Sequence, residues 1–265
     1  MKITHYLYNA FIIESGNKKI AIDPGALFFY FFRFTTLIPK SEWHSITHIF
    51  VTHGDPDHYW QADRVASTAN APVIMNKTMI KQTGEETRIL APRRGGLKYL
   101  PYRGKTIALD VGQTVDIGNV RIEGLKAQHG PIEVKILGIT KRTDPGPKER
   151  TGFGSIGFRI TIDGKTFVNV GDSLLQEEWS NLKPDVLMLP IGGLGNNTWT
   201  MDVTDALEAA RMISPKLVIP CHYNVPFFWI RKMAAADDQQ FRLGVEKMGI
   251  ECQVMRYNDE FQLTS

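Results

Sequence analysis

The sequence predicts an α/β fold of the sandwich or barrel type, and three observations lead to it. The chain has 265 residues, which is long for an average domain but within the range of a single α/β sandwich or barrel. Its composition, 43% hydrophobic and 22% charged, is that of a globular protein able to bury a sizeable core. Short β-like runs fill the first two thirds, and strands alternate with helices in the last third. We therefore expect one domain over residues 1–265.

The N-terminal third shows short β-like runs between turn-forming residues. The expected strands are Lys2 to Leu7, Ala10 to Ile13 and Lys19 to Ile22, with turns at Gly16-Asn17 and Asp23-Pro24-Gly25. This spacing is typical of successive antiparallel strands. A buried strand from His48 to Thr52 and a helix from Gln61 to Ala69 come next.

The middle of the chain again predicts strands, interrupted by one long irregular segment. The expected strands lie within Lys105 to Lys126, around a turn at Asp116 to Asn119, and then at Ser155 to Ile162 and Lys165 to Val170. The segment from Gly130 to Gly154 is rich in proline, glycine and charged residues, so we interpret it as a long loop. Loops of this length are usually functional or mobile.

The last third predicts a βαβ arrangement. Its expected elements are strand Val186 to Pro190, helix Asp202 to Ile213, strand Leu217 to Pro220, helix Asp237 to Met248 and strand Glu251 to Met255. Asp202 has a residue type preferred at helix N-caps.

Charge and cysteine content exclude several classes of protein. The net charge of +3 is small and scattered, which argues against nucleic acid as a main partner. The 2 cysteines are too few for a disulfide framework, and the N-terminus lacks the pattern of a secretory signal peptide. The most apolar stretch, Ala26 to Ile38, is interrupted by Arg33 and is shorter than the roughly 20 apolar residues of a spanning helix. We expect a cytoplasmic protein.

The strongest local signal is the sequence His53-Gly54-Asp55-Pro56-Asp57-His58 on the expected strand-to-helix loop. Imidazoles and carboxylates two residues apart on a turning loop can converge on one metal ion, while the adjacent Asp57 and His58 can serve a second ion close by. Three further residues each follow an expected strand, where a sheet presents its loops: His129, Asp172 and His222. This set predicts a dinuclear metal site.

Taken together, these residues resemble the metallo-β-lactamase superfamily, whose motif His-x-His-x-Asp-His is followed by a single His, a single Asp and a final His. The resemblance implies a four-layer αββα sandwich. Within the superfamily, the chain looks most similar to the branch of ascorbate-6-phosphate lactonase-like proteins and metal-dependent hydrolases. That narrower resemblance is carried by Gly171-Asp172-Ser173, Lys183-Pro184-Asp185, Leu189 to Gly193, and Ile219 to Asn224.

By position, the resemblance implies two ligand sets joined by one carboxylate. One ion is held by His53, Asp55 and His129, the other by Asp57, His58 and His222, and Asp172 bridges them. Two positions depart from the family pattern: Asp55 stands where most members have histidine, and Tyr8-Asn9 stands where this branch carries Gly-His. Zinc is the first expectation for the two divalent ions, but the Asp55 carboxylate also suits manganese or iron.

The implied activity is metal-dependent hydrolysis of an ester, lactone, amide or phosphodiester bond in a small molecule. A water activated by the two ions attacks the carbonyl or phosphoryl centre. Asp57 would also orient this water, and Tyr223 or Asn224 would donate a hydrogen bond to the developing oxyanion or support a ligand. Two alternatives are a di-iron redox protein, because flavodiiron proteins carry a carboxylate at the second motif position, and a non-catalytic metal-binding protein.

Several residues keep a second interpretation. Asp172 also suits the N-cap of a helix over Leu174 to Trp179. The aromatic run Leu27 to Phe34, with Pro226 to Trp229, suggests a lid, an apolar substrate pocket, a dimer contact or a membrane-surface contact, and core packing carries the same weight as all four together.

Other conspicuous side chains receive structural interpretations first. The basic stretch from Pro92 to Lys105 would attract an anionic substrate group or anionic lipid, but we favour a solvated loop. Cys221 is expected to be a small buried apolar residue rather than a reactive thiol. His5, His44 and His48 are expected to be structural.

Overall fold

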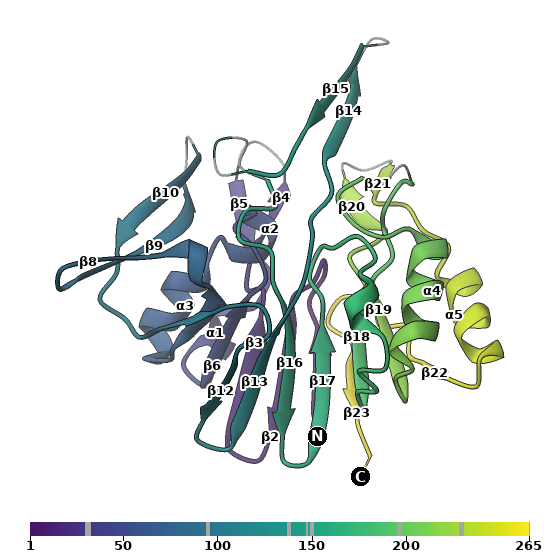
Figure 1. Ribbon diagram of the computed structural model, residues 1–265, viewed down its shortest axis with the longest axis horizontal. Helices are drawn as coiled ribbons and strands as arrows, with labels where there is room; N and C mark the ends of the chain where they lie inside the picture. Colours follow the sequence, from purple (N-terminus) through teal and green to yellow (C-terminus); the bar gives the residue numbers. More distant parts are fainter. Residues whose placement is uncertain are drawn as a thin grey trace.

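Two stacked β-sheets form the centre of the molecule. The computed structural model describes residues 1–29, 33–93, 96–136, 139–146, 148, 151–195, 198–227 and 231–264. Within these residues each of the two large sheets has seven strands, and helices cover both outer faces (Figure 1). The layers are therefore helix, sheet, sheet, helix, which confirms the four-layer αββα sandwich.

The first sheet is built mostly from the N-terminal third. Its strands are β1 (Lys2–His5), β2 (Phe11–Ser15), β3 (Lys18–Ile22), β6 (His48–Val51), β7 (Val73–Asn76), β11 (Thr106–Leu109) and β23 (Glu260–Gln262). They lie in the order β11-β7-β6-β3-β2-β1-β23. The expected antiparallel start is confirmed for β1, β2 and β3, and β6 then pairs parallel to β3.

The second sheet collects the strands of the middle and last third. Its strands are β12 (Thr114–Ile117), β13 (Val120–Leu125), β16 (Gly157–Ile162), β17 (Lys165–Asn169), β18 (Val186–Pro190), β19 (Leu217–Cys221) and β22 (Glu251–Cys252). They lie in the order β12-β13-β16-β17-β18-β19-β22, parallel from β17 onward. The strand expected over Glu251 to Met255 is shorter than predicted, because its ladder to β19 stops at Cys252.

Alternation along the strands separates the layers. In β2, Phe11 and Ile13 enter the core between the sheets, while Ile12 packs on the outer side with the helices. The first sheet's outer face is covered by α1 (Lys40–Trp43) and α3 (Ala62–Ala69), and the second sheet's by α4 (Val203–Ile213) and α5 (Asp238–Lys247). Burying apolar side chains from both faces of each sheet drives this stacking.

Helix ends in the last third follow the expected chemistry. The Asp202 carboxylate accepts hydrogen bonds from the backbone N–H groups of Thr204 and Asp205 at the start of α4. Asp237 caps α5 in the same way. The alternative interpretation of Asp172 as a helix N-cap was wrong, because that segment forms only a 3-10 turn, η2 (Glu177–Trp179), whose N-cap position is Gln176.

The long loop expected from Gly130 to Gly154 is the main error of the sequence analysis. It contains a hairpin of β14 (Ile132–Ile136) and β15 (Ile139–Thr143), which projects from the body of the molecule (Figure 1). The alternation of isoleucine and valine in β14 carries the strand signal. The glycine, proline and charged residues that flank β14 favour a loop, so this strand was not predicted.

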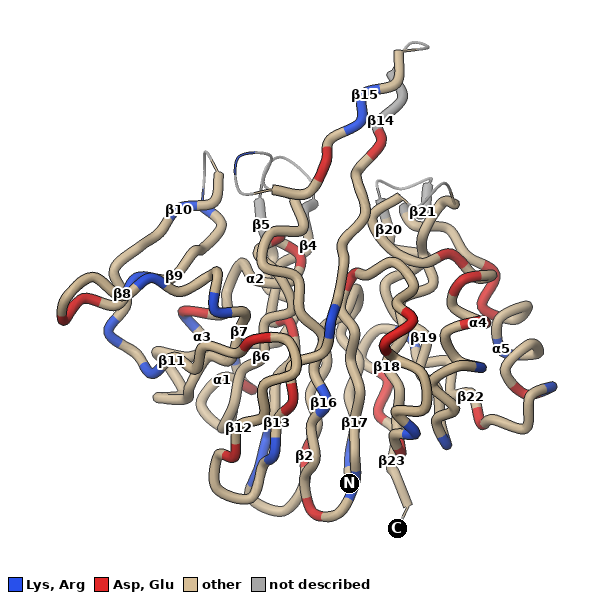
Figure 2. The backbone as a smooth tube through the Cα atoms, viewed as in Figure 1, with Lys and Arg blue, Asp and Glu red and all other residues tan. Residues whose placement is uncertain are grey.

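A second group of short strands forms beside the first sheet. It consists of β8 (Ile80–Thr83), β9 (Glu86–Arg93) and β10 (Gly96–Pro101), with η1 (Lys77–Met79) before it. The basic stretch is therefore largely strand, and the loop interpretation was wrong. Figure 2 shows Lys and Arg along this part of the chain. Elsewhere in the molecule, basic and acidic residues are mixed.

The aromatic segments form two further hairpins in the backbone. The first pairs β4 (Ala26–Phe29) with β5 (Arg33–Thr36), and the second pairs β20 (Val225–Phe227) with β21 (Arg231–Met233). The side chains of residues 28–34 and 227–233 lie outside the described residues, as does Arg94. Among the residues that the structure describes, no helix is long and apolar enough to cross a membrane.

Candidate metal centre

The motif of the sequence analysis lies on the turn that connects β6 to α2 (Pro56–Tyr59). Pro56 stands at the first helical position, where its missing N–H costs nothing. Asp57 and His58 therefore belong to the helix, while His53 and Asp55 precede it. Gly25 permits this packing, because a Cβ there would lie 1.9 Å from the carbonyl oxygen of Asp57.

The other three residues come from the ends of strands in the second sheet. His129 follows β13, Asp172 follows β17 and His222 follows β19. Gly171 turns the chain with a φ of +60° and lies so close to Thr52 that a Cβ would be 2.6 Å from that side chain. The two sheets thus bring all seven predicted ligands to one edge of the sandwich, and all except Asp57 are buried.

Ligand atoms from the two sheets converge within this edge. In the described part of the chain, three groups have one ligand atom per residue within 4.8 Å of one another: His53, Asp55 and His129; Asp57, His58 and His222; and His53, His58 and Asp172. The structure therefore brings together both predicted ligand sets. Their assignment as metal ligands stays a prediction.

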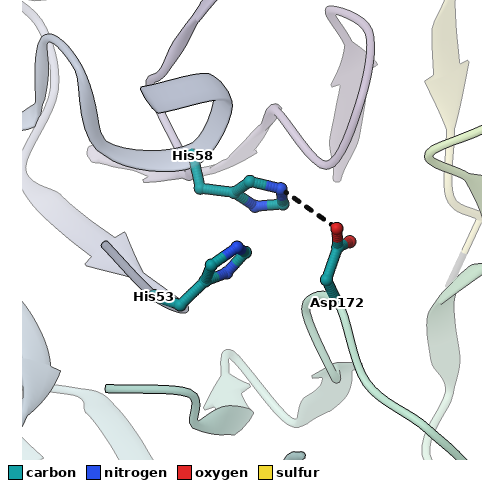
Figure 3. Close-up of side chains that lie close together, drawn as sticks. All are labelled: His53, His58 and Asp172. Atoms are coloured by element: carbon teal, nitrogen blue, oxygen red, sulfur yellow. Dashed lines mark ion pairs between the residues drawn. The ribbon is translucent and has the colours of Figure 1, made fainter. Parts of the chain in front are cut away.

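Asp172 lies between the two sets. Its Oδ2 atom is 3.1 Å from Nε2 of His222, 3.6 Å from Nε2 of His58 and 4.0 Å from Nε2 of His129. Figure 3 shows the carboxylate directed at His58, with His53 beside it. A carboxylate in this position can contact ions on both sides.

Four buried polar atoms of the cluster have no hydrogen-bond partner among the described residues. They are Nε2 of His53, Nε2 of His58, Nδ1 of His222 and Oδ1 of Asp172. An unsatisfied buried polar group costs about 1–3 kcal/mol, so native proteins rarely leave several together without a ligand. Imidazole nitrogens with carboxylate oxygens are a donor set that zinc, iron and manganese accept. The residues fit a metal centre.

Charges within the cluster stabilise one another. Burial opposes ionisation of Asp57, but His58 and His222 outweigh it and lower the pKa of Asp57 to about 2. The same two rings hold the pKa of Asp172 well below its usual range, again against burial. Burial also opposes protonation of His58 and His222, yet Asp172 and Asp57 raise the pKa of both rings.

The pKa of His129 shifts in the opposite direction. Burial, followed by the neighbouring His53 ring, lowers its pKa below the ordinary value. A divalent ion binds neutral imidazole, so at a given pH it has to displace more protons from His58 and His222 than from His129.

Comparison with known proteins decides the family. The model of the beta-lactamase superfamily domain matches residues 2–222. The chain belongs to the metallo-β-lactamase superfamily. The resemblance inferred from the motif is confirmed at this level, while the narrower lactonase-like branch stays a prediction.

Relatives and solved structures agree with this assignment. A UPF0173 metal-dependent hydrolase of Pelotomaculum thermopropionicum is 32% identical over 254 residues, covering 93% of this chain and 92% of the relative. One from Alkaliphilus metalliredigens is 32% identical over 227 residues, covering 84% and 86%. The structure of Igni18, a metallo hydrolase from Ignicoccus hospitalis, shares the fold with a TM-score of 0.68 at 21% identity, covering 99% of each chain. The expected enzyme class, a metal-dependent hydrolase, is confirmed.

One residue important to this superfamily member escaped the sequence analysis. Asp23 accepts hydrogen bonds from Nδ1 of His58 at 2.7 Å, the Thr52 N–H at 2.7 Å and the Thr52 hydroxyl at 2.6 Å. It therefore fixes the ring so that Nε2 faces the cluster. The signal was present, because Asp23 directly follows a strand at the same sheet edge, but Asp-Pro-Gly was interpreted only as a turn.

Asn9, one of the two departures from the family pattern, links the sheets. Its amide donates to Asp23 at 2.6 Å and to Asn169 at 2.9 Å, and Asn169 donates back at 2.9 Å. The Cys221 thiol also lies 3.4 Å from the Asn9 carbonyl. Cys221 is buried and burial raises its pKa, in agreement with the expected inert role.

Tyr8, which belongs to the same departure as Asn9, lies against the last predicted ligand. Its ring centroid is 5.2 Å from that of His222, and its carbonyl accepts the His222 N–H at 2.9 Å. Tyr8 adopts a φ of +48°, a conformation that glycine adopts freely and that costs a tyrosine about 1 kcal/mol or more. A strained aromatic residue therefore lies beside the candidate centre.

Tyr223 and Asn224 point their polar groups elsewhere. The Tyr223 hydroxyl donates to Asp238 at 3.2 Å, at the start of α5. The Asn224 amide donates to the carbonyl of Ala236 at 2.9 Å and accepts its N–H at 3.3 Å. Their predicted catalytic role stays a prediction, and these contacts lend it no support.

Proposed function

We propose that the chain hydrolyses an ester, lactone, amide or phosphodiester bond of a small molecule at a two-metal centre. The centre consists of the seven predicted residues: His53, Asp55, Asp57, His58, His129, Asp172 and His222. The observation that carries the proposal is the position of Asp172, within 4.0 Å of three histidine nitrogens from both ligand sets. When bound, two divalent ions would supply Lewis acidity and a water of lowered pKa.

The donor set suggests zinc first. Four imidazoles and three carboxylates form a mixed nitrogen and oxygen set, in which zinc is common. The Asp55 carboxylate gives its half of the centre more oxygen than a histidine would, so manganese and iron are the alternatives.

Asp57 is the residue best placed to orient the attacking water. Its side chain is 28% exposed, against 10% or less for the other six, so it borders the solvent. Its Oδ2 lies 3.4 Å from Nε2 of His222 and 3.6 Å from Nε2 of His58. Because its pKa is about 2, the carboxylate is ionised near neutral pH and accepts a hydrogen bond from water.

A groove beside His129 is the proposed substrate site. It has a volume of about 720 Å³ and is lined by polar residues that include Asn76 and Gln128 and by apolar ones that include Phe153 and Leu174. Arg142 also lines it, but its guanidinium is bound by Glu133 at 2.7 Å. The groove therefore suits a small molecule with polar and apolar parts, and an anionic one only where that ion pair opens.

Metal analysis combined with turnover tests the proposal. Protein purified without added metal would be assayed on ester, lactone, amide and phosphodiester model compounds, before and after removal of metal by a chelator. We expect bound divalent metal and metal-dependent hydrolysis of one class. Asp172→Asn should lose both, whereas Asp116→Asn on the exposed face of β12 should lose neither.

Two results would contradict hydrolysis at a metal centre. Full turnover after chelation would remove the metal from the reaction. Bound iron with redox-active spectra and no hydrolysis would favour the di-iron alternative, which the carboxylate at Asp55 supports.

A further inference from the structure

Asp55 is held by a segment far away in the sequence. Its Oδ1 atom accepts the N–H of Gly152 at 2.7 Å, and its Oδ2 atom accepts the Thr151 hydroxyl at 3.3 Å. Asp55 and Thr151 are both buried. The carboxylate is thus fixed by two donors from the segment that follows β15.

This arrangement leaves one oxygen directed at the cluster. Oδ2 of Asp55 lies 3.6 Å from Nε2 of His53 and 3.7 Å from Nε2 of His129. An aspartate is shorter than the histidine that most superfamily members carry here, so its orientation decides whether it reaches a metal. Anchoring Oδ1 turns the other oxygen toward the two rings.

The capping role that the position of Asp55 suggests does not account for these bonds. Asp55 stands at the N-cap of α2, but its side chain accepts no capping hydrogen bond from that helix. Its carboxylate is instead committed to Thr151 and Gly152.

Gly152 lies against the other side of the same ligand set. Its φ is +59°, and a Cβ there would lie 2.5 Å from Cβ and Cγ of His129. The segment also runs beside the motif, with the Gly54 N–H donating to Phe153 at 2.9 Å and the Ile156 N–H donating to Thr52 at 2.9 Å. One short segment therefore contacts Asp55, His129 and the motif backbone at once.

We propose that Thr151 and Gly152 are positioning residues that make an aspartate at position 55 usable as a metal ligand. The proposal rests on the metal centre of the proposed function. Hydrogen bonds to ligating carboxylates commonly change metal affinity by about tenfold to a hundredfold. Thr151 and Gly152 accordingly set the affinity of the His53, Asp55 and His129 set and leave the other set unchanged.

The test measures metal affinity rather than turnover. Wild type, Thr151→Val and Thr151→Ser would be stripped with a chelator and titrated with Zn²⁺ and Mn²⁺ by calorimetry. Valine keeps the shape and removes the hydroxyl, so it should weaken one of two binding events by about tenfold or more. Serine should restore it. Thr161→Val on β16 is the matched control, because its hydroxyl makes a bond of the same 3.3 Å length far from the centre.

A double-mutant cycle separates positioning from general stability. In an Asp55→His background, Thr151→Val should have no effect on affinity, because an imidazole needs no bond from the hydroxyl. Gly152→Ala should weaken the same binding event more than Thr151→Val does. Thermal melting of each metal-free variant shows whether it is folded.

The outcomes are distinct. Wild-type affinity in Thr151→Val, or an equal loss in the Asp55→His background, overturns the proposal. A wild-type chain that binds no metal overturns the proposed function, and this inference with it. Two sites of which one responds to Thr151 support both.

Discussion

The two ligand sets of the candidate centre are supported by different parts of the molecule. Asp57, His58 and His222 form what we call the core-held set, because Asp23 and the Thr52 backbone fix His58 within the buried edge of the first sheet. The loop-held set is His53, Asp55 and His129. It is supported by the segment after the β14–β15 hairpin and by the Gly130 carbonyl, which lies 2.5 Å from Nδ1 of His129.

This difference predicts two sites of unequal affinity. His58 of the core-held set is oriented by Asp23 at the end of β3, which cannot move without disturbing the first sheet. Asp55 of the loop-held set depends instead on Thr151 and Gly152, in a short segment that follows a projecting hairpin. We expect the core-held set to bind its ion more tightly than the loop-held set does.

Removing the support of the core-held set should have the largest effect. Asp23→Ala leaves Nδ1 of His58, the Thr52 hydroxyl and the Asn9 amide without their shared acceptor. Breaking a buried charged pair by removing one partner costs about 3–5 kcal/mol, so the metal-free variant should unfold at much lower urea concentration. It should also lose the tighter binding event. A variant with wild-type unfolding free energy would show that the network contributes little.

Changes at Asp55 should remove one ion and leave the fold intact. Asp55→Ala should bind about half the metal of the wild type, because the core-held set keeps its three residues and Asp172. Asp55→His should bind the full amount. Inductively coupled plasma mass spectrometry after dialysis measures both. If neither change alters metal content, Asp55 is not a ligand and the two sets do not differ as proposed.

The strained tyrosine beside the core-held set offers a smaller test. Tyr8→Phe removes the hydroxyl from a ring that lies 5.2 Å from the His222 ring, and Tyr223→Phe removes a hydroxyl that is bound to Asp238. If the Tyr8 phenol donates a hydrogen bond to the substrate, Tyr8→Phe should lower kcat/KM by about tenfold, or about 1.4 kcal/mol, with metal content unchanged. Tyr223→Phe should have little effect. The reverse result would restore Tyr223 as the oxyanion donor.

The sequence alone predicts the ligands of both sets but not the residues that support them. The strands of the two large sheets that lead to the ligands were predictable, because apolar runs end just before His53, Asp172 and His222. The support was not, because it depends on pairings between residues far apart in the chain. Asp23 meets Thr52 across 29 positions, Gly152 meets Asp55 across 97 and Asn9 meets Asn169 across 160. No local periodicity encodes such contacts.

Local sequence signals also gave an incomplete account of two aspartates, because aspartate is common in turns and helix caps as well as in metal sites. Asp-Pro-Gly at Asp23 is a good turn, and Gly-Asp-Ser at Asp172 is a good helix start, so both aspartates had a sufficient local explanation. Their carboxylates instead face the histidines. The pairing of β3 with β6 decides the role of Asp23, and the stacking of the two sheets decides that of Asp172.

The smallest expected effect is in the pH dependence of the metal-free protein. His58 and His222 have raised pKa values, so their stabilising contribution is present below the unfolded pKa of about 6.5 and is lost as pH rises through the folded value. His129 has a lowered pKa, so it destabilises the fold as pH falls below about 6.5. His5 and His48 also have pKa values lowered by burial, so they add to the effect of His129 and oppose that of His58 and His222.

Variants resolve these opposing contributions. In urea unfolding of metal-free protein, His129→Gln should make stability rise more steeply on acidification, because one of the buried histidines with a lowered pKa is then absent. His222→Gln should make it rise less steeply. Asp57 and Asp172 do not contribute in this window, because their lowered pKa values keep them ionised throughout. If both variants changed the slope in the same direction, the two sets would share one electrostatic environment, and the distinction between core-held and loop-held ligands would rest on hydrogen bonding alone.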